Sequence, residues 1–222
     1  RYIGQEDFKN IDVVMDLAGL SNDPSCDIDE KLTIDINHNG TVNVAHQAKK
    51  AGVNQYILAS SCSVYGYSED TMLDEEAGKN PISLYAKCKL DSEIKIGQMA
   101  SNDFCVTFMR KGTLFGLSNK MRFDLIVNIM TMHAVENSRI VITGQGEQWR
   151  PLLHVQDAAE AYLSVIEAER DTINGEAFNV GNNEDNYQVK NVARLVQQEI
   201  PAAEIIVAPD DVDKRSYNVN FD

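Results

Sequence analysis

The chain has 222 residues, of which 43% are hydrophobic, and its 34 acidic and 20 basic side chains give a formal net charge of -14. This length suits one large α/β domain or one domain with a small lobe, and the apolar fraction can fill a core. The acidic balance argues against a nucleic-acid partner, because a phosphate backbone binds clustered lysine and arginine.

The cysteine pattern and the hydropathy exclude several classes of protein. The four cysteines show no CxxC or Cys/His ligand spacing, so we expect neither a disulfide framework nor a metal site. No apolar run approaches the ~18 residues that a membrane-spanning helix needs, and no signal-peptide pattern is present. We therefore expect a cytoplasmic protein with no membrane partner.

The first part of the chain alternates strand and helix patterns. Residues 11–19 (IDVVMDLAG) form a continuous apolar run ended by glycine, which is typical of a parallel strand buried on both faces. A helical pattern runs from 27 to 51, where Gly52 gives a stop signal, and residues 55–59 (QYILA) form the next apolar run. A strand, a long helix and a second strand predict a right-handed crossover with the two strands parallel.

The remaining patterns indicate further helices and shorter strands. We expect an acidic loop at 67–81, a helix at 83–100 and a strand at 104–110. A glycine-bearing loop at 111–120 and a helix at 124–137 should follow. After residue 137 we expect short strands at 140–143 and 149–155 and helices at 157–168 and 189–199. This change of organisation predicts a smaller second lobe.

A serine-rich segment and a tyrosine–lysine pair carry the candidate chemistry. The segment SSCSVYG (60–66) begins at the carboxyl end of the second predicted strand, where ligands bind in open α/β sheets. Tyr85 and Lys89 are four residues apart, so on a helix their side chains share one face. A nearby ammonium favours the phenolate, and lowering a tyrosine pKa from ~10 by ~3 units takes ~4 kcal/mol of differential stabilisation. Lys89 is the expected main contributor, and an oxidised nicotinamide would add to it.

Five motifs occur in order along the chain: DLAGLSNDPS (16–25), INHNGT (36–41), SSCSVYG (60–66), Tyr85 with Lys89, and WRPLLHVQD (149–157). With these motifs the chain resembles the extended short-chain dehydrogenase/reductase family, in particular the NAD-dependent epimerases and dehydratases that act on nucleotide sugars. The resemblance covers nearly all of the chain. It implies an α/β fold with a Rossmann-like doubly wound parallel sheet and a smaller C-terminal substrate lobe. Residues 1–137 would form a partial dinucleotide-binding domain with the catalytic helix, and residues 138–222 mainly the substrate-binding lobe, interwoven with the first.

The resemblance assigns roles to the residues of these motifs. Tyr85 would act as general base or acid at the sugar hydroxyl, Lys89 would hold the nicotinamide ribose and lower the Tyr85 pKa, and Ser61 would orient the hydroxyl. The cofactor would be NAD, with NADP as the alternative. Its expected contacts are Ala18, Gly19, Leu20, Asn37, Ser60, Tyr85, Lys89, Gly112 and Thr113.

The resemblance also implies a nucleotide-sugar substrate and a homodimer. The expected substrate contacts are Ser61, Ser63, Arg150 and Arg215. Arg150 would grip the diphosphate, a task suited to a planar cation with several donors. Many epimerases of the family have asparagine at the position of Thr113, so this chain differs from them on the sugar side.

Two residues discriminate between the reactions of the family. In the 4,6-dehydratases an acidic pair at this site removes water across the ring, and the decarboxylases keep the glutamate of that pair. This chain has Cys62 and Ser63 there. We therefore expect an epimerase that oxidises its substrate transiently to a keto sugar and then returns the hydride. A keto-sugar reductase or a 4,6-dehydratase of the same family is the alternative, and a catalytically silent dinucleotide-sensing protein is the alternative of another class.

One motif of the family is absent from the chain. The glycine-rich turn GxxGxxG, which aims backbone amides at the cofactor pyrophosphate, does not occur in it. The segment GQGEQ (144–148) precedes a short predicted strand rather than a helix, so it cannot replace that turn. Because the chain also begins with Arg1 rather than methionine, we expect a missing N-terminal strand–helix–strand unit upstream.

Overall fold

The computed structural model describes residues 3–68, 72–208 and 215–222 and contains a four-stranded parallel sheet. Its strands, in their order across the sheet, are β1 (Val13–Asp16), β2 (Gln55–Ser61), β3 (Cys105–Lys111) and β7 (Ala177–Val180). Each neighbouring pair is parallel. The parallel α/β sheet predicted from the sequence is therefore confirmed.

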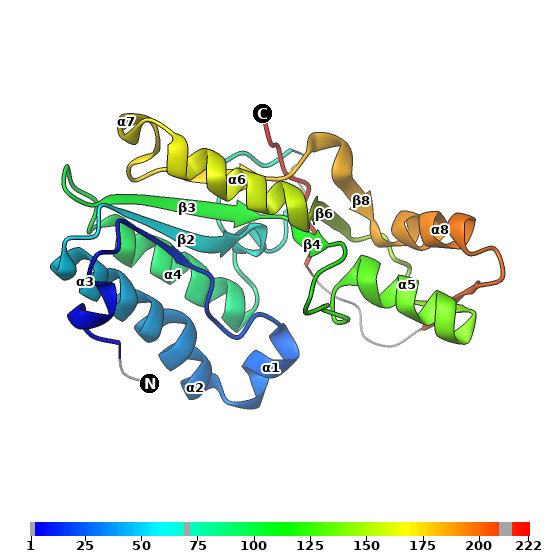
Figure 1. The fold of residues 1–222 in the computed structure, drawn as a ribbon. Coiled ribbons are helices and arrows are strands. Elements are labelled where there is room, and N and C mark those ends of the chain that lie inside the picture. Colours follow the sequence, from blue (N-terminus) through cyan, green and yellow to red (C-terminus); the bar gives the residue numbers. More distant parts are fainter. Residues whose placement is uncertain (1–2, 69–71, 209–214) are drawn as a thin grey trace.

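Helices cover both faces of this sheet (Figure 1). The helices α3 (Thr41–Ala51) and α4 (Leu84–Gly97) lie against one face, and α6 (Val155–Glu167) lies against the other. The crossover from β1 to β2 runs through α3, as the sequence pattern predicts. The short helix α7 (Arg170–Ile173) follows α6 and leads into β7.

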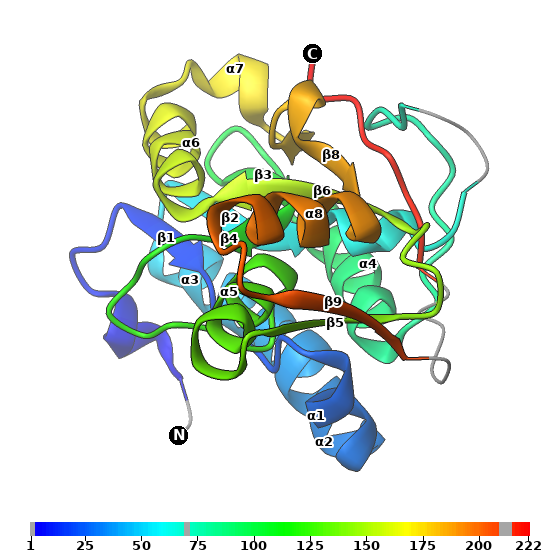
Figure 2. The ribbon, with the colours of Figure 1, turned by 90° about the vertical axis from the view of Figure 1, so that its right-hand side faces the viewer.

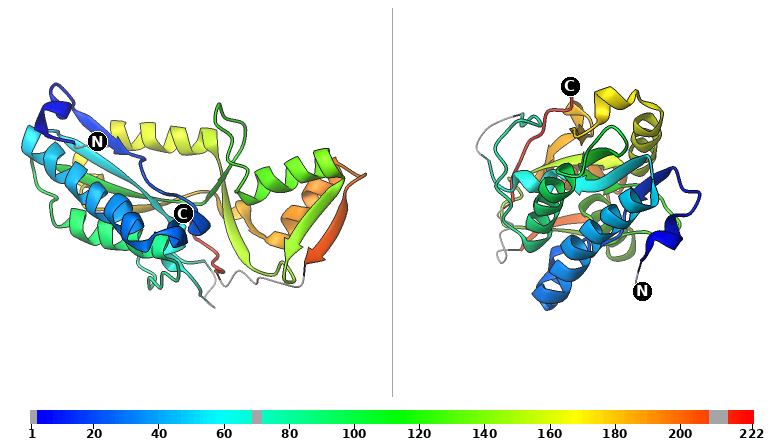
Figure 3. Two further views of the ribbon diagram at one scale, coloured as in Figure 1. Left: turned by 90° about the horizontal axis from the view of Figure 1, so that it is seen from below. Right: turned by 90° about the vertical axis from the view of Figure 1, so that its left-hand side faces the viewer.

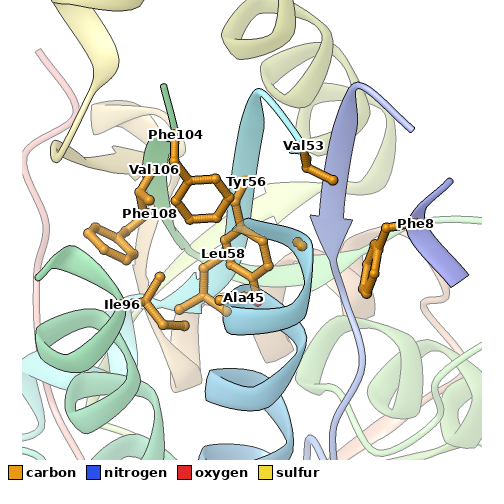
Figure 4. Close-up of a cluster of buried hydrophobic side chains, with 10 residues drawn as sticks. Phe8, Ala45, Val53, Tyr56, Leu58, Ile96, Phe104, Val106 and Phe108 are labelled. Carbon is orange, nitrogen blue, oxygen red and sulfur yellow. The ribbon is translucent and has the colours of Figure 1, made fainter. Parts of the chain in front are cut away.

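The alternation of side chains along β2 and β3 divides the core of this sheet into two clusters. On the side of α3 and α4, Figure 4 shows buried side chains from the strands and the helices, among them Tyr56, Leu58, Val106, Phe108, Ala45 and Ile96. On the side of α6 the cluster contains Ile57, Ala59, Cys105, Met109, Ala158, Tyr162 and Val165. Fully burying one large apolar side chain contributes about 1.5–3 kcal/mol. The same alternation continues to the carboxyl ends of the strands, so it fixes the direction of the polar side chains there.

A second group of elements lies beyond the carboxyl ends of β2 and β3 (Figures 1 and 3), and Figure 2 looks onto it. Its elements are β4 (Thr113–Phe115), α5 (Ile126–Asn137), β5 (Arg139–Thr143), β6 (Trp149–His154), β8 (Asn186–Gln188), α8 (Val189–Glu199) and β9 (Glu204–Ala208). Strands β4, β6 and β8 form one sheet, and β5 pairs with β9. Apolar side chains of α5, β5 and α8 form the core of this group.

The helix predicted from 27 to 51 is wrong as one continuous element. It is replaced by α1 (Asp23–Ile28), α2 (Glu30–Ile34), a π-helical segment (Asp35–Gly40) and α3. The break falls at Asp29, whose backbone is extended and whose carboxylate accepts the Leu32 N–H at 2.9 Å as a new N-cap. The end of α3 is confirmed at Gly52, which adopts the left-handed conformation with φ of 83°.

The other predicted helices and strands are confirmed with small shifts of their ends. The predicted loop 111–120 contains β4, because residues 113–115 pair with β6. The expectation that β1 is buried on both faces is wrong, since Met15 is 47% exposed on this edge strand. The acidic loop 67–81 contains no helix and no named strand in its described part, and its residues 69–71 lie outside the described ranges.

The structure also contains elements that the sequence patterns did not predict, namely α7, β7, β8, β9 and 3-10 turns at Gln5–Phe8, Cys62–Tyr65 and Asn183–Asp185. Strand β7 and helix α6 come from the second part of the sequence but pack with the large parallel sheet. Within the described ranges, every helix is too short or too polar to cross a membrane.

Candidate active site

The amino-terminal half of α4 carries the tyrosine and the lysine. Ser83 caps this helix, and its hydroxyl accepts the Ala86 N–H at 3.3 Å. Tyr85 and Lys89 follow one turn apart, and the Lys89 Nζ lies 5.8 Å from the centroid of the Tyr85 ring. Lys89 is 4% exposed. The two side chains therefore share one helix face, as their spacing predicts.

Ser61 lies beside this pair at the carboxyl end of β2. Its hydroxyl hydrogen-bonds the side chain of Tyr85 and accepts the Ser63 N–H at 3.1 Å. The second of these contacts caps the 3-10 turn that follows the strand. The strand end and the first turn of α4 thus bring the predicted serine, tyrosine and lysine together.

A cavity of about 460 Å³ opens at this edge of the large sheet. It is lined by most of the residues that the sequence marks as candidates: Ala18, Gly19, Leu20, Ser60, Ser61, Ser63, Tyr85, Lys89, Gly112, Thr113 and Arg215. Two predicted residues, Asn37 and Arg150, do not line it. Below, we call it the first cavity.

Asn37 lies outside the first cavity and hydrogen-bonds to Leu20, one of the residues that line it. Its Oδ1 accepts the Leu20 N–H at 2.7 Å, and its Nδ2 donates to the Leu20 carbonyl at 2.8 Å. A Cβ at Gly19, where φ is 150°, would lie 2.9 Å from the Asn37 Oδ1. Asn37 sits in the π-helical segment, a local geometry that is frequent at functional sites. Asn37 therefore supports this turn and does not itself line the cavity.

Arg150 lies in a second cavity of about 560 Å³, which shares walls with the first. Its guanidinium donates to the carbonyls of Trp149 and Arg215, each at 2.6 Å, and lies 5.6 Å from the centroid of the Tyr217 ring. Arg215 lines both cavities and forms an ion pair with Asp23. The two predicted arginines therefore meet in the second cavity, together with apolar side chains of α5 and β5.

Arg122 is a residue of both cavities that the sequence analysis missed. It pairs with Asp124 and donates to the Ser21 hydroxyl at 2.7 Å. Its charge also lowers the pKa of Tyr85. No motif marks Arg122, because its position depends on the path of the loop between β4 and α5. An arginine two residues before an aspartate was the available signal, and that pattern is common on surfaces.

Ser60 has a structural partner in addition to its place on the cavity wall. Its hydroxyl donates to the Glu93 carboxylate, and Glu93 forms a buried ion pair with Arg110 at 2.8 Å. Ser60 and Arg110 are register partners in β2 and β3, and both side chains point to the α4 side of the sheet. The hydroxyl of Ser60 thus fixes the strand against α4.

Burial dominates the protonation of the side chains in the first cavity. It raises the pKa of Tyr85 to about 12, although the Ser61 hydrogen bond and the Arg122 charge lower it. The expectation that Lys89 lowers the Tyr85 pKa towards neutrality is therefore wrong for the protein alone, because desolvation of the phenolate is the larger effect. Burial also lowers the pKa of Lys89, against the charge of Asp16.

The walls of the first cavity fit a polar ligand. Ser63 is 4% exposed, and its Oγ has no hydrogen-bond partner in the structure. Asp23, the one acidic residue among the described residues that line the cavity, also leaves its Oδ1 without a partner. Buried polar atoms without partners are costly, so a ligand that bonds to them recovers free energy. Hydroxyl groups of a sugar could bond to these atoms, and the hydroxyls of a nicotinamide ribose could bond to Lys89 on the same wall.

Two curated proteins show how far the sequence similarity extends. The dTDP-D-glucose 4,6-dehydratase of Mus musculus is 29% identical over 163 residues, which cover 73% of this chain and 44% of that protein. The putative UDP-glucose 4-epimerase of Methanocaldococcus jannaschii is 26% identical over 172 residues, which cover 75% of this chain and 56% of that protein. The chain thus spans about half the length of these relatives.

A solved structure shows the same fold over almost the whole chain. The NAD dependent NDP-hexosamine 5,6-dehydratase TunA, involved in tunicamycin biosynthesis, has a TM-score of 0.87 and 21% identity, covering 99% of this chain and 71% of that one. At this identity the likeness supports the Rossmann-like fold alone. The sequence model of the NAD dependent epimerase/dehydratase family matches residues 5–181, most of the chain. The resemblance inferred from the motifs is thereby confirmed, and the chain belongs to the NAD dependent epimerase/dehydratase family.

Proposed function

We propose that the protein is an NAD-dependent nucleotide-sugar epimerase that oxidises its substrate to a keto sugar and returns the hydride to the other face. The observation that carries this proposal is the first cavity, where Ser61, Tyr85 and Lys89 meet and where Cys62 and Ser63 follow Ser61 in place of an acidic pair. Bound NAD would supply the hydride acceptor and donor. The chain itself has to bind and orient the substrate and the cofactor, and it has to move the proton.

Tyr85 moves the proton in this scheme. Its phenolate, which a bound oxidised nicotinamide would favour, accepts the proton of the sugar hydroxyl as the ketone forms, and the resulting phenol gives the proton back when the ketone is reduced. Ser61 orients the hydroxyl, and the Ser63 Oγ without a partner can bond to a second hydroxyl. Lys89 holds the ribose next to the nicotinamide.

The nucleotide diphosphate of the substrate fits the second cavity. Arg122, Arg150 and Arg215 line it, and arginine suits phosphate because its planar donors bind two oxygens at once. The apolar wall of α5 and β5 offers a surface for the base. Because the two cavities share Thr113 and Arg122, a single extended ligand can reach from one into the other.

The residues after Ser61 favour epimerisation over dehydration. Cys62 is 1% exposed, its thiol donates to the Arg110 carbonyl at 3.1 Å, and burial raises its pKa well above the usual value. It therefore cannot exchange protons with a sugar at neutral pH. Asp23 is engaged by Arg215 through one carboxylate oxygen. An elimination would lack the acidic pair that the 4,6-dehydratases have directly after this serine.

Tyr85→Phe tests the proposal on the full-length protein. We expect turnover of the nucleotide sugar to fall about 10²-fold or more, the usual size of a lost acid–base group, with the circular dichroism spectrum unchanged. Tyr67→Phe is the matched control, because Tyr67 is 49% exposed and lines neither cavity. Near-normal turnover by the folded Tyr85→Phe protein would falsify the proposal.

Product analysis with a substrate deuterated at the oxidised carbon separates the alternatives. An epimerase returns deuterium to an inverted centre with no net change in NADH, and a keto-sugar reductase consumes NADH. A dehydratase yields a product lighter by one water. A silent dinucleotide-sensing protein binds the cofactor and transfers no deuterium.

We also propose that the protein acts as a cytoplasmic homodimer. The helices α1 and α2 contact α4, and each of the three carries a large exposed apolar side chain: Ile28 of α1 is 84% exposed, Leu32 of α2 50% and Ile94 of α4 57%. The four cysteines are free and buried, which fits a reducing compartment. Light scattering of the purified full-length protein tests the dimer, and a monomeric mass at micromolar concentration would contradict it.

A further inference from the structure

Lys111 is a second lysine in the first cavity, and the proposed cycle gives it no role. It is the last residue of β3 and the register partner of Ser61. Its Nζ donates to the Tyr162 hydroxyl at 3.1 Å and lies 5.5 Å from the centroid of that ring. Because Tyr162 belongs to α6, Lys111 points to the α6 side of the sheet, opposite to its neighbour Arg110.

No acid pairs with Lys111 within residues 3–68, 72–208 and 215–222. The ion pairs of the structure involve other residues. The Tyr162 phenol that accepts its hydrogen bond is neutral, because burial raises the Tyr162 pKa above the usual value. The largest charge effect on Lys111 comes from Lys89, another cation. The cavity therefore contains an ammonium group that no acid of the described residues pairs with.

A purely structural role does not account for this lysine. Burying an ammonium group without a paired acid costs stability. The preceding residue on the same face of β3 is Met109, which packs in the apolar cluster under α6. An apolar side chain at position 111 would extend that cluster. Charged groups whose burial lowers the stability of the fold are concentrated at functional sites, where they interact with a ligand.

The walls of the first cavity indicate which part of a ligand Lys111 faces. Ala59 and Ala158 line the cavity on the α6 side, to which Lys111 also points, and their small apolar side chains can accommodate an aromatic ring. The polar side chains Thr113 and Arg122 lie instead where the first cavity joins the second. The sugar fits at the polar junction, and the nicotinamide ring fits at the apolar wall beside Lys111.

We infer that Lys111 is the charge that sets the preference of this site between oxidised and reduced NAD. The inference rests on the proposed function. The oxidised nicotinamide ring is positively charged and the reduced ring is neutral, so protonated Lys111 repels only the oxidised form. Lys111 thereby favours withdrawal of hydride from the sugar and stabilises the state that contains the keto sugar and the reduced cofactor.

The preference depends on pH because Lys111 titrates near neutrality. Burial, followed by the charge of Lys89, lowers the pKa of Lys111 to about 8. The groups that face it are Lys89 from α4, Cys62 from the 3-10 turn and Tyr162 from α6, and Asp16 of β1 acts on Lys89 and Tyr162. Cys62 and Tyr162 stay neutral, because burial raises the pKa of each. As the pH rises through about 8, Lys111 loses its charge and the repulsion disappears.

Binding measurements on the full-length protein test this inference without turnover. Dissociation constants for NAD⁺, NADH and ADP-ribose are measured by calorimetry for the wild type and Lys111→Met at about pH 7 and about pH 9. At neutral pH we expect Lys111→Met to bind NAD⁺ about 10-fold more tightly, as removal of a like charge in partly buried surroundings predicts. Affinity for NADH and for ADP-ribose, which lacks the ring, stays close to that of the wild type. The exposed Lys120 provides the control Lys120→Met, which leaves all three constants unchanged.

The pH dependence of the wild type gives a second readout that needs no variant. Its ratio of NAD⁺ to NADH dissociation constants should fall between pH 7 and pH 9 towards the ratio of Lys111→Met. If both cofactors bind and neither the substitution nor the pH changes this ratio, the inference is wrong while the proposed function stands. Weaker binding of a nucleotide sugar by Lys111→Met at an unchanged ratio would also overturn it, since Lys111 would then be a substrate contact. Failure of the wild type to bind either cofactor would refute the proposed function itself.

Discussion

Tyr85 is a neutral phenol in the protein alone, because burial raises its pKa to about 12. The Ser61 hydrogen bond and the Arg122 charge act in the opposite direction but do not overcome burial. A neutral phenol can donate its proton to a keto oxygen at once. Taking a proton from a hydroxyl requires further positive charge in the cavity, as an oxidised nicotinamide supplies. The protonation state of Tyr85 in the protein alone thus suits the reductive half of the proposed cycle, and the charge of the oxidised cofactor would ready Tyr85 for the oxidative half.

Lys111 leads to a stability prediction that needs no ligand. Its pKa of about 8 in the folded chain is below the ~10.4 of an unfolded lysine. Between these values the unfolded state binds more protons, so stability rises with pH, and below pH 8 the folded state carries the full cost of the buried charge. We expect Lys111→Met to raise the free energy of unfolding at neutral pH, and this gain to shrink as the pH approaches ~10.

Urea titrations of the wild type and Lys111→Met across this pH range measure the gain. The comparison cancels the contribution of Lys89, whose pKa is also lowered by burial. Lys120→Met is again the control, because an exposed lysine carries no such cost. A gain that is absent at neutral pH, or that grows with pH, would show that the charge of Lys111 is compensated.

Among the elements, the π-helical segment Asp35–Gly40 determines how the turn before α1 is held. It aims the side chain of Asn37, which is 1% exposed, at both backbone groups of Leu20. We expect Asn37→Ala to lower the free energy of unfolding by about 2–3 kcal/mol, since two hydrogen bonds are lost and partly buried polar groups of Leu20 are left without partners. Asn37→Asp keeps an acceptor for the Leu20 N–H but no donor for its carbonyl.

The two Asn37 variants and one control make this prediction specific. Asn37→Asp should fall between the wild type and Asn37→Ala in chemical denaturation. Asn39 is exposed in the same π-helical segment and bonds only to Asp35 among the described contacts, so Asn39→Ala should change stability by less than about 0.5 kcal/mol. Equal losses for Asn37→Ala and Asn39→Ala would contradict the role of the Leu20 contacts.

The elements that could be predicted are those whose pattern lies within one segment. The apolar runs of β2 and β3 and the capped helix α4 were recognisable, and the spacing of Tyr85 and Lys89 placed both on one helix face. Strands β7, β8 and β9 have three to five residues, too few to show a period, and they form by pairing with distant strands. Arg122 and the pairing of Asn37 with Leu20 depend in the same way on contacts between distant segments. Such contacts cannot be read from local sequence.

Over the whole molecule, the distribution of charge sets the cavities apart from the rest of the surface. The chain has a net charge of -14, yet the cationic residues at the two cavities are Lys89, Lys111, Arg122, Arg150 and Arg215. Two carboxylates, Asp23 and Asp124, also line the cavities, which leaves an excess of positive charge, and such an excess raises the local concentration of oppositely charged ligands. An anionic nucleotide is therefore attracted to these cavities, while the acidic surface keeps other anions away.

A buried polar network connects the elements that carry the site. Glu93 of α4 binds Arg110 of β3 at 2.8 Å and accepts the hydroxyl hydrogen of Ser60 of β2. Arg110 also donates to the Tyr65 hydroxyl at 3.2 Å, and Tyr65 donates to the Asn179 side chain of β7 at 2.7 Å. The network thus joins α4, the helix with the candidate catalytic residues, to three strands of the large sheet. It fixes the position of Tyr85 and Lys89, which precede Glu93 on the same helix.

A double-mutant cycle tests whether this network acts as a unit. Breaking a buried ion pair leaves one uncompensated charge, so Glu93→Leu and Arg110→Met should each lower the free energy of unfolding by about 3–5 kcal/mol. The double variant leaves neither charge buried alone, and its loss should be clearly smaller than the sum of the two. The partly exposed pair of Lys190 and Glu147 is the control, and Lys190→Met should have little effect. Strictly additive losses in urea unfolding would mean that Glu93 and Arg110 stabilise the fold independently and that no network positions α4.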